Sequence, residues 1–185
     1  MGGRIWILWK PNLVDILFLD YNAQYIHMSV TNANTQLQFY YTMVYAFNGD
    51  SDREELWLNL RRISNNIQGP WVVGGDFNFV TQAHERLGGN VTSTETEPFQ
   101  NCIEDCDLSD MSYTGVFYTW NNKQPLETRV YSRLDMRFVN HSWRVQMPAY
   151  FANFLPEGHF DHTSYVVSMD QANKEKNRSF KYFNM

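Results

Sequence analysis

A hydrophobic stretch runs directly into a turn that carries an acid and an amide in residues 71–78, which read WVVGGDFN. The two glycines let the backbone turn sharply, so the next side chains project from the carboxyl end of the expected strand. Side chains alternate along extended backbone, so Asp76 and Asn78 should share one side while Phe77 faces the core. A carboxylate and a carboxamide so placed can hold and polarise a water molecule or a phosphate oxygen. The same residues would also suit an Asx turn at a strand end.

A second acid, Asp135, follows an apolar neighbour in residues 132–135, which read SRLD. A buried carboxylate is costly unless it is paired, and a histidine is a natural partner for it. The alternative is a surface salt bridge between Asp135 and a nearby arginine. The segment therefore indicates a paired carboxylate without deciding its partner.

An acid and a histidine stand side by side in residues 158–162, which read GHFDH. Adjacent side chains point in different directions, so Asp161 could bind a metal ion while His162 faces a substrate. Magnesium takes a few carboxylates and keeps several waters, which suits acids that are scattered singly along the chain. Two other interpretations are a polar turn with a solvated histidine and a zinc site built from His159 and His162, for which no third ligand is placed.

The expected strands are the elements that must position these side chains. Short β-branched and aromatic runs predict strands at residues 5–9, 14–19, 25–30, 37–46, 71–73, 134–139 and 165–169, and one around 119–120. Apolar spacing predicts a helix over 52–67, capped by Ser51 or Asp52 and stopped by Gly69-Pro70. A polar loop over 83–97 then leads to a second helix over about 98–106. Strands interleaved with two helices predict an α/β or α+β layered domain.

Composition bounds the class of protein. The 185 residues fit one domain, and 43% hydrophobic and 16% aromatic content is enough for a folded core. A net charge of -5 argues against a protein held on nucleic acid by charge alone, but it is compatible with an enzyme that touches DNA transiently. Cys102 and Cys106 have no second pair to complete a zinc site, so we expect reduced packing residues in an intracellular protein. No apolar run reaches the length of a membrane span, so no membrane partner is expected.

Taken in order, the segments GDFN, RLD and DH resemble the endonuclease/exonuclease/phosphatase superfamily, which includes DNase I and the apurinic endonucleases. Further segments are similar to the endonucleases of plant non-LTR (LINE-type) retrotransposons: residues 3–9 (GRIWILW), 44–46 (VYA), 55–57 (ELW), 69–78 (GPWVVGGDFN), 118–120 (YTW), 138–140 (FVN) and 180–185 (FKYFNM). The resemblance covers nearly all of the chain and implies a four-layer sandwich of two mixed sheets with helices outside. It makes residues 1–170 a partial domain of this kind and 171–185 a polar tail or the start of a linker.

The resemblance also implies roles for single residues. Asp76 matches the acid that orients or activates the attacking water, and Asn78 matches the amide that holds the phosphate and that water. His162 matches the histidine beside the scissile phosphate, and Asp135 matches the carboxylate that fixes its tautomer. Asp161 matches a carboxylate on the metal side of the site.

Tyr45 and Asn48 match phosphate-contacting positions after the central strand, although Tyr45 could also be an ordinary strand aromatic. The implied reaction is metal-dependent nicking of DNA, in which water attacks a phosphodiester in line and a 3′-hydroxyl is left. Magnesium, or manganese in its place, would neutralise the developing charge. The phosphodiester backbone of DNA would be the partner, and a nuclear location would follow.

The sequence departs from the pattern of this superfamily in ways that predict little or no nuclease activity. The first strands of the pattern carry an asparagine and the glutamate that is the principal metal ligand, and this chain has a match to neither. We therefore expect weakened metal binding and a catalytically impaired, N-terminally truncated fragment. Phe160 replaces a serine before the Asp-His pair, and Met136 replaces an arginine. The alternatives are an inactive nucleic-acid- or protein-binding remnant and a phosphoesterase with a non-DNA substrate.

Overall fold

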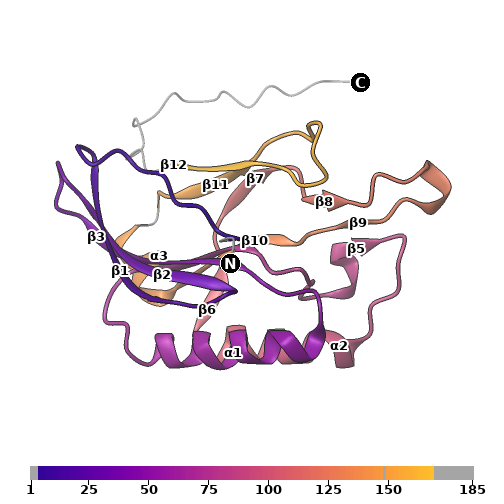
Figure 1. Ribbon diagram of the computed structural model, residues 1–185, viewed down its shortest axis with the longest axis horizontal. Helices are drawn as coiled ribbons and strands as arrows, with labels where there is room; N and C mark the ends of the chain where they lie inside the picture. Colours follow the sequence, from indigo (N-terminus) through magenta and orange to yellow (C-terminus); the bar gives the residue numbers. More distant parts are fainter. Residues whose placement is uncertain (1–3, 148, 169–185) are drawn as a thin grey trace, which may run out of the picture.

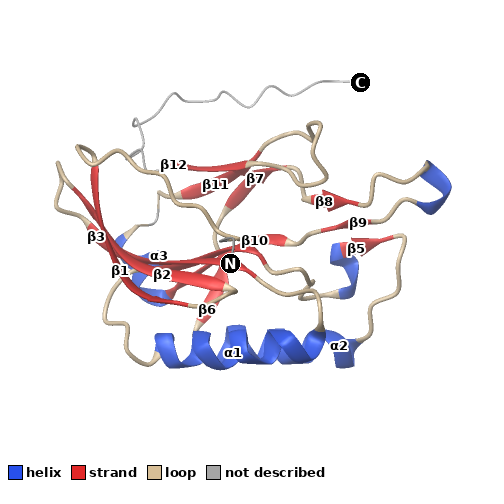
Figure 2. Ribbon diagram, viewed as in Figure 1, coloured by secondary structure: helices blue, strands red, loops and turns tan. Residues whose placement is uncertain are grey.

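The computed structural model describes residues 4–147 and 149–168, which form stacked layers (Figures 1 and 2). Helices α1 (Asp50–Ser64) and α2 (Ser93–Asp105) cover one face of a six-stranded sheet. A three-stranded sheet lies over the other face, and a second three-stranded sheet lies toward one end of the molecule, at the right in Figure 1. The α/β sandwich expected from the sequence is confirmed, and the tail expected at 171–185 lies outside the described residues.

The six-stranded sheet brings the ends of three strands to one edge. Its order is β1 (Val14–Tyr21), β2 (Tyr25–Asn32), β3 (Gln38–Tyr45), β4 (Trp71–Asp76), β10 (Asp135–Asn140) and β6 (Leu108–Asp110). β3 and β4 are parallel because α1 crosses between them, whereas the other neighbours are antiparallel. The carboxyl ends of β3 and β4 therefore lie beside the amino end of β10.

The two smaller sheets consist of short strands. One has the order β12 (Tyr165–Ser168), β11 (Phe151–Phe154) and β7 (Tyr113–Gly115), and the other has the order β5 (Arg86–Leu87), β9 (Tyr131–Ser132) and β8 (Trp120–Asn121). Single-turn helices occupy Ala83–Glu85 and Leu126–Thr128, and a short helix α3 spans His141–Gln146. Several of these elements, including β6, β7, β11 and α3, were not expected from the sequence because each is too short to show a period.

The central strands are buried on both faces, which explains their continuous hydrophobic character. Val73 packs with Leu56, Trp57 and other residues in a cluster under α1 and α2. Its neighbour Val72 packs with Phe154 and others in a second cluster between the sheets. Because side chains alternate along a strand, adjacent residues of β4 serve the two clusters in turn. The core thus lies on both sides of the strands that carry the candidate site.

Helix α1 begins and ends earlier than the predicted span of 52–67. Its N-cap is Gly49, which provides no side-chain hydrogen bond, so the predicted caps Ser51 and Asp52 are wrong and both lie inside the helix. Acidic residues in the first turn favour this start electrostatically without a side-chain cap. The helix ends at Ser64, before the Gly-Pro pair, where the N–H of Asn66 bonds the carbonyl of Ile63 in a tightened last turn.

Helix α2 begins at Ser93, five residues before the predicted start at 98. The reason is a capping box: the Thr92 hydroxyl accepts from the Glu95 N–H at 3.4 Å, and the Glu95 carboxylate accepts from the Thr92 N–H at 2.8 Å. Pro98 lies inside the helix on its exposed side rather than at its first position. The predicted polar loop over 83–97 is accordingly too long, because it also contains β5.

The strand predicted at 5–9 is absent, since residues 5–10 have no regular secondary structure. The alternation that suggested it is real: Ile5 and Ile7 are half-buried, while Trp6 and Leu8 are exposed. Ile7 packs against the cluster between the sheets, so the pattern reports burial of one side of the segment without strand pairing.

The predicted state of the cysteines is confirmed. Cys102 and Cys106 are free and buried in the cluster under the helices. None of the helices in the described part of the chain has the length and apolar character needed to cross a lipid bilayer.

Candidate active site

Three of the predicted residues form a row across the sheet edge. Asp76, the last residue of β4, pairs with Tyr45 at the end of β3 and with Asp135 at the start of β10. Paired residues on adjacent strands put their side chains on the same face of the sheet. We call Tyr45, Asp76 and Asp135 the site row. This register brings Asp76 and Asp135 together, as their matched roles in one site imply.

Gly75 allows the row to form. It has φ of 152°, and a Cβ at this position would lie 1.8 Å from the carbonyl oxygen of Val44 on β3. Only a residue without a side chain lets β3 and β4 come this close directly before Asp76. The glycine in the sequence segment GGDFN thus sets the spacing of two strands as well as the turn.

His162 lies over the row. Its Nδ1–H donates to the Asp135 carboxylate at 2.9 Å, and its Nε2 lies 3.8 Å from Asp76 Oδ2. The histidine comes from a loop that is tied to β8 by an isolated bridge between Trp120 and His162. The N–H of Thr163 also donates to the carbonyl of Thr119 at 2.7 Å. The predicted pairing of Asp135 with a histidine is therefore confirmed, and the salt-bridge alternative for Asp135 is not needed.

Thr119 is a positioning residue that sequence reasoning did not single out. Its buried Oγ1 accepts from the backbone N–H of Leu134 at 3.0 Å and of Asp135 at 2.9 Å. Its carbonyl holds the histidine loop from the other side. One residue thus fixes both partners of the Asp135–His162 pair. The only sequence signal was its place in the segment YTW.

Asn78 follows Asp76 by two residues and lies in a left-handed turn, with φ of 51°. Its N–H donates to Asp76 Oδ1 at 2.8 Å, which is an Asx turn, and its side-chain amide donates to the carbonyl of Ala46 at 2.8 Å. Phe77 between them is fully buried, as expected. The Asx-turn interpretation is therefore correct, and the turn leaves Asp76 Oδ2 to face His162. The phosphate-holding role of Asn78 stays a prediction.

Arg53 of α1 holds the backbone that carries the two predicted asparagines. Its guanidinium donates to the carbonyls of Phe47 at 3.0 Å, Asn48 at 2.7 Å and Asn78 at 3.5 Å. Asn48 itself is exposed, and among the described residues no hydrogen bond joins its side chain to the site row. The structure therefore does not bring Asn48 into the row, and its predicted substrate contact stays untested.

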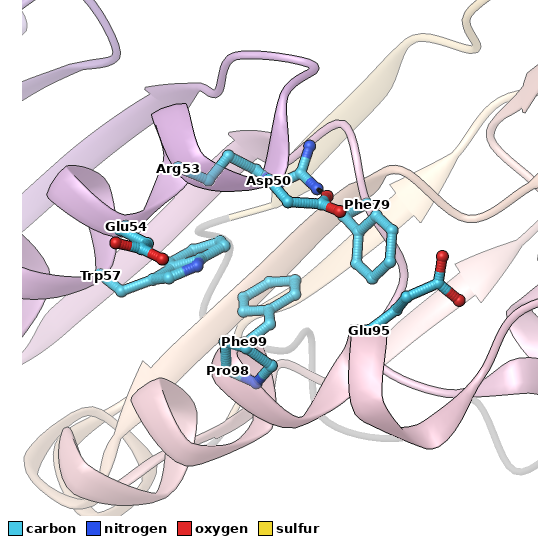
Figure 3. A pocket seen from close by; sticks show the side chains of 8 residues that line it. All are labelled: Asp50, Arg53, Glu54, Trp57, Phe79, Glu95, Pro98 and Phe99. Atoms are coloured by element: carbon cyan, nitrogen blue, oxygen red, sulfur yellow. Dashed lines mark hydrogen bonds and ion pairs between the residues drawn. The ribbon is translucent and has the colours of Figure 1, made fainter.

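Arg53 also lines a small pocket between α1 and α2. Figure 3 shows Arg53 and Phe79 at one end of this pocket and Trp57 and Phe99 along it. The cavity is about 70 Å³, which accommodates water and excludes a nucleotide. The pocket therefore belongs to the packing that supports the site rather than to the site.

Asp161 comes directly before His162 in the same loop and contacts Trp120 of β8. Its Oδ2 accepts from the indole N–H of Trp120 at 3.3 Å, and the residue is exposed. Across residues 4–147 and 149–168, no group of three or more His, Cys, Asp or Glu side chains is placed to hold a metal ion. The described side chains as placed therefore do not make up a metal site. The metal role of Asp161 stays a prediction.

The two replacements noted in the sequence do not alter the row. Phe160 is 78% exposed, so its bulk projects into solvent. Met136 is fully buried in the cluster under the helices, on the face of β10 opposite Asp135. An arginine at 136 would therefore point away from the row.

The pKa values of the row and the histidine are shifted in ways that suit proton transfer. Burial raises the pKa of Asp76 to about 6, and the charge of Asp135 adds to the rise, while the Asn78 N–H, His162 and Arg4 oppose it. Burial lowers the pKa of His162, but the hydrogen bond and charge of Asp135, with the charges of Asp76 and Asp161, outweigh this and raise it above 6.5. A carboxylate and an imidazolium can thus coexist near neutral pH.

The arrangement can act as a general base beside a positively charged acid. Asp76 presents one free carboxylate oxygen, and His162 presents Nε2 beside it with its other nitrogen fixed by Asp135. The same geometry orients the imidazole in catalytic triads, where the carboxylate stabilises the charged ring. Such a pair suits phosphoester hydrolysis, in which a base can take a proton from the attacking water and an acid can protonate the leaving oxygen.

Comparison with known proteins supports the fold. No protein-family model matches the chain, and no curated protein matches its sequence. Among solved structures, the endonuclease domain of TRAS1, a telomere-specific non-LTR retrotransposon, superposes with a TM-score of 0.63 at 13% identity, over 83% of this chain and 68% of that one. A mannosyl-6-phosphatase from Bacteroides thetaiotaomicron gives 0.54 at 17% identity, over 86% and 68%. An endonuclease/exonuclease/phosphatase family protein from the same organism gives 0.52 at 17% identity, over 86% and 64%. The chain therefore has the DNase I-like fold of endonuclease/exonuclease/phosphatase proteins.

Proposed function

We propose that this domain hydrolyses phosphodiesters and that its substrate is DNA, which it nicks. The observation that carries the proposal is His162, hydrogen-bonded to Asp135 at 2.9 Å and 3.8 Å from the free oxygen of Asp76. The fold shared with a retrotransposon endonuclease domain supports the choice of DNA. A DNA substrate would require access to the nucleus or to another compartment that holds DNA.

In the proposed reaction, a water molecule attacks phosphorus in line with the 3′ oxygen. Asp76 takes a proton from the water, and His162 gives its Nε2 proton to the leaving 3′ oxygen as the phosphorus–oxygen bond breaks. Asp135 keeps the imidazole charged and oriented during this transfer. The products are a 5′-phosphate and a 3′-hydroxyl. Magnesium would add charge neutralisation, and its requirement stays a prediction because the described residues lack a metal cluster.

Turnover is expected to be slow. Two carboxylates of the site face the phosphate position, and the charge neutralisation that a metal ion supplies is worth several kcal/mol in such sites. The net charge of -5 also disfavours tight binding of DNA by charge alone, which weakens the alternative of a pure binding remnant.

The test is nicking of supercoiled plasmid by the purified chain, with magnesium and with EDTA. His162→Ala is the active-site variant, and His159→Ala is its matched control because His159 is exposed three residues earlier. We expect nicking that His162→Ala loses and His159→Ala keeps. Equal nicking by the two variants would refute the proposal, and loss in EDTA would establish the metal requirement.

A phosphatase with a non-DNA substrate is the second candidate, because a mannosyl-6-phosphatase has the same fold with a TM-score of 0.54. The same protein preparations incubated with a phosphorylated sugar and with an aryl phosphate monoester separate the two. Release of phosphate that depends on His162, without plasmid nicking, would favour this candidate.

A further inference from the structure

Arg4 stands beside the site row. Its guanidinium carbon lies 4.1 Å from the centre of the Tyr45 ring and 4.9 Å from the centre of the Phe47 ring. Tyr45 is the row residue next to Asp76. The positive charge of Arg4 is near enough to Asp76 to counter the rise in the pKa of that carboxyl. An N-terminal segment with no regular secondary structure therefore places the Arg4 guanidinium beside the site row.

The donors of Arg4 are available to a ligand. The residue is exposed, and in the part of the chain that the structure describes no hydrogen bond or ion pair engages its guanidinium. Stacking on two aromatic rings fixes the plane of the group while leaving its N–H edge open. A guanidinium edge presents parallel N–H donors that match two oxygens of a phosphate.

Three arginines on neighbouring elements are paired within the protein or buried. Arg53 of α1 is bonded to backbone carbonyls and to Asp50. Arg133, just before β10, is paired with Glu85 and Asp110, and Arg137 of β10 is buried. A phosphate at the row would meet two carboxylates, and Arg4 is the arginine placed to offset them.

We propose that Arg4 binds phosphate at this site, and that its guanidinium donates to two non-bridging oxygens of a phosphate held against Asp76 and His162. The inference rests on the proposed function for its location, but it concerns binding and does not need turnover. The ligand chemistry is a phosphate group, either within a nucleic acid backbone or as a free or terminal phosphate.

The test measures binding in EDTA by the full chain. One arm uses fluorescence anisotropy with a labelled DNA duplex across a salt series, and the other follows the Arg4 Nε–H resonance during titration with inorganic phosphate. The variants are Arg4→Gln, which removes both the positive charge and the paired N–H donors, and Arg4→Lys, which keeps the charge but not the paired donors. Lys10→Gln is the matched control because it removes one charge from the same exposed segment.

We expect Arg4→Gln to weaken binding of the duplex about tenfold and to reduce the salt slope by about 1, whereas Lys10→Gln changes affinity much less. Arg4→Lys should keep the salt slope but lose part of the affinity, because a point charge cannot bind two oxygens at fixed geometry. Circular dichroism of each variant shows that the fold is kept.

Response of the Arg4 resonance to phosphate but not to duplex would support a free or terminal phosphate as the ligand, and response to duplex would support the backbone. Equal affinities of Arg4→Gln and Lys10→Gln, or no response of the resonance to either ligand, would overturn the inference. If Arg4→Gln loses binding while nicking does not depend on His162, this inference stands and the proposed function is refuted. If nicking depends on His162 while Arg4→Gln binds as tightly as wild type, the proposed function stands and this inference is refuted.

Discussion

Replacing Asp135 by asparagine should reduce turnover while leaving the fold in place. The asparagine has nearly the same size, and the backbone N–H at this position still donates to the Thr119 hydroxyl. The substitution removes the carboxylate that accepts from His162 Nδ1 at 2.9 Å. The new amide would also be free to donate to the ring and so stabilise the wrong tautomer.

The magnitude follows from the burial of the pair. Asp135 is 12% exposed and His162 is 32% exposed at the side chain, so solvent screens the interaction only in part. A hydrogen bond to a charged group in such a place contributes about 1.5–3 kcal/mol. If the imidazolium is needed in the transition state, loss of this bond slows the reaction by about 10- to 150-fold.

The pH dependence gives a second readout. Activity that needs ionised Asp76 should fall as pH drops below about 6. Activity that needs protonated His162 should fall as pH rises through its raised pKa, which lies above 6.5. Because the pKa of His162 is raised on folding, its stabilising contribution is present below 6.5 and is lost as pH rises through the folded pKa. In Asp135→Asn, the pH at which activity falls on the alkaline side should be lower than in wild type. The loss of stability relative to wild type should appear only at pH values below the folded pKa of His162.

Single-turnover nicking rates across pH and an NMR titration of the histidine rings measure both effects. The chain has five histidines, so the spectrum of His162→Ala identifies the signal. Asp105→Asn, which removes an exposed carboxylate paired with Arg61 on the helices, is the control. If the His162 titration in Asp135→Asn matches wild type, the reasoning about the pair is wrong, whatever the rate does.

Three further substitutions test how the structure supports the site. Gly75→Ala should lower the free energy of unfolding by about 1–3 kcal/mol in chemical denaturation because its Cβ meets backbone, whereas Gly158→Ala, with open space around it, should leave stability unchanged. Thr119→Val should cost about 2–4 kcal/mol by leaving two buried N–H groups unpaired, and a mild loss with full activity would contradict its positioning role. Arg137→Met should stabilise the fold by about 1–3 kcal/mol and so raise the melting temperature. The reason is that Nε and Nη2 of this buried arginine have no hydrogen-bond partner among the described residues, and burial lowers its pKa to about 10. A lower melting temperature would show that the charge is compensated.

The sequence alone predicted the central elements of the fold because their patterns are long. Strands β2 and β3 and helix α1 each bury an apolar face over eight residues or more, so their patterns are visible. Strand β4 is buried on both faces, and its continuous apolar run before the double glycine revealed it. The helix starts were wrong where capping geometry decided them, as at Thr92. The segment at residues 5–9 showed the period of a strand without forming one, because alternation reports which side is buried and not whether the backbone finds a partner.

For the site, residue types and local order were enough to single out Asp76, Asp135 and His162. An acid after a double glycine and an Asp-His pair before a final strand are local features that a sequence carries. What brought them together was the register of β3, β4 and β10, which joins residues far apart along the chain. Pairings at such separations depend on packing of the whole sheet, and no local pattern encodes them. For the same reason, only the tertiary structure could place Thr119 behind the pair and Arg4 beside it.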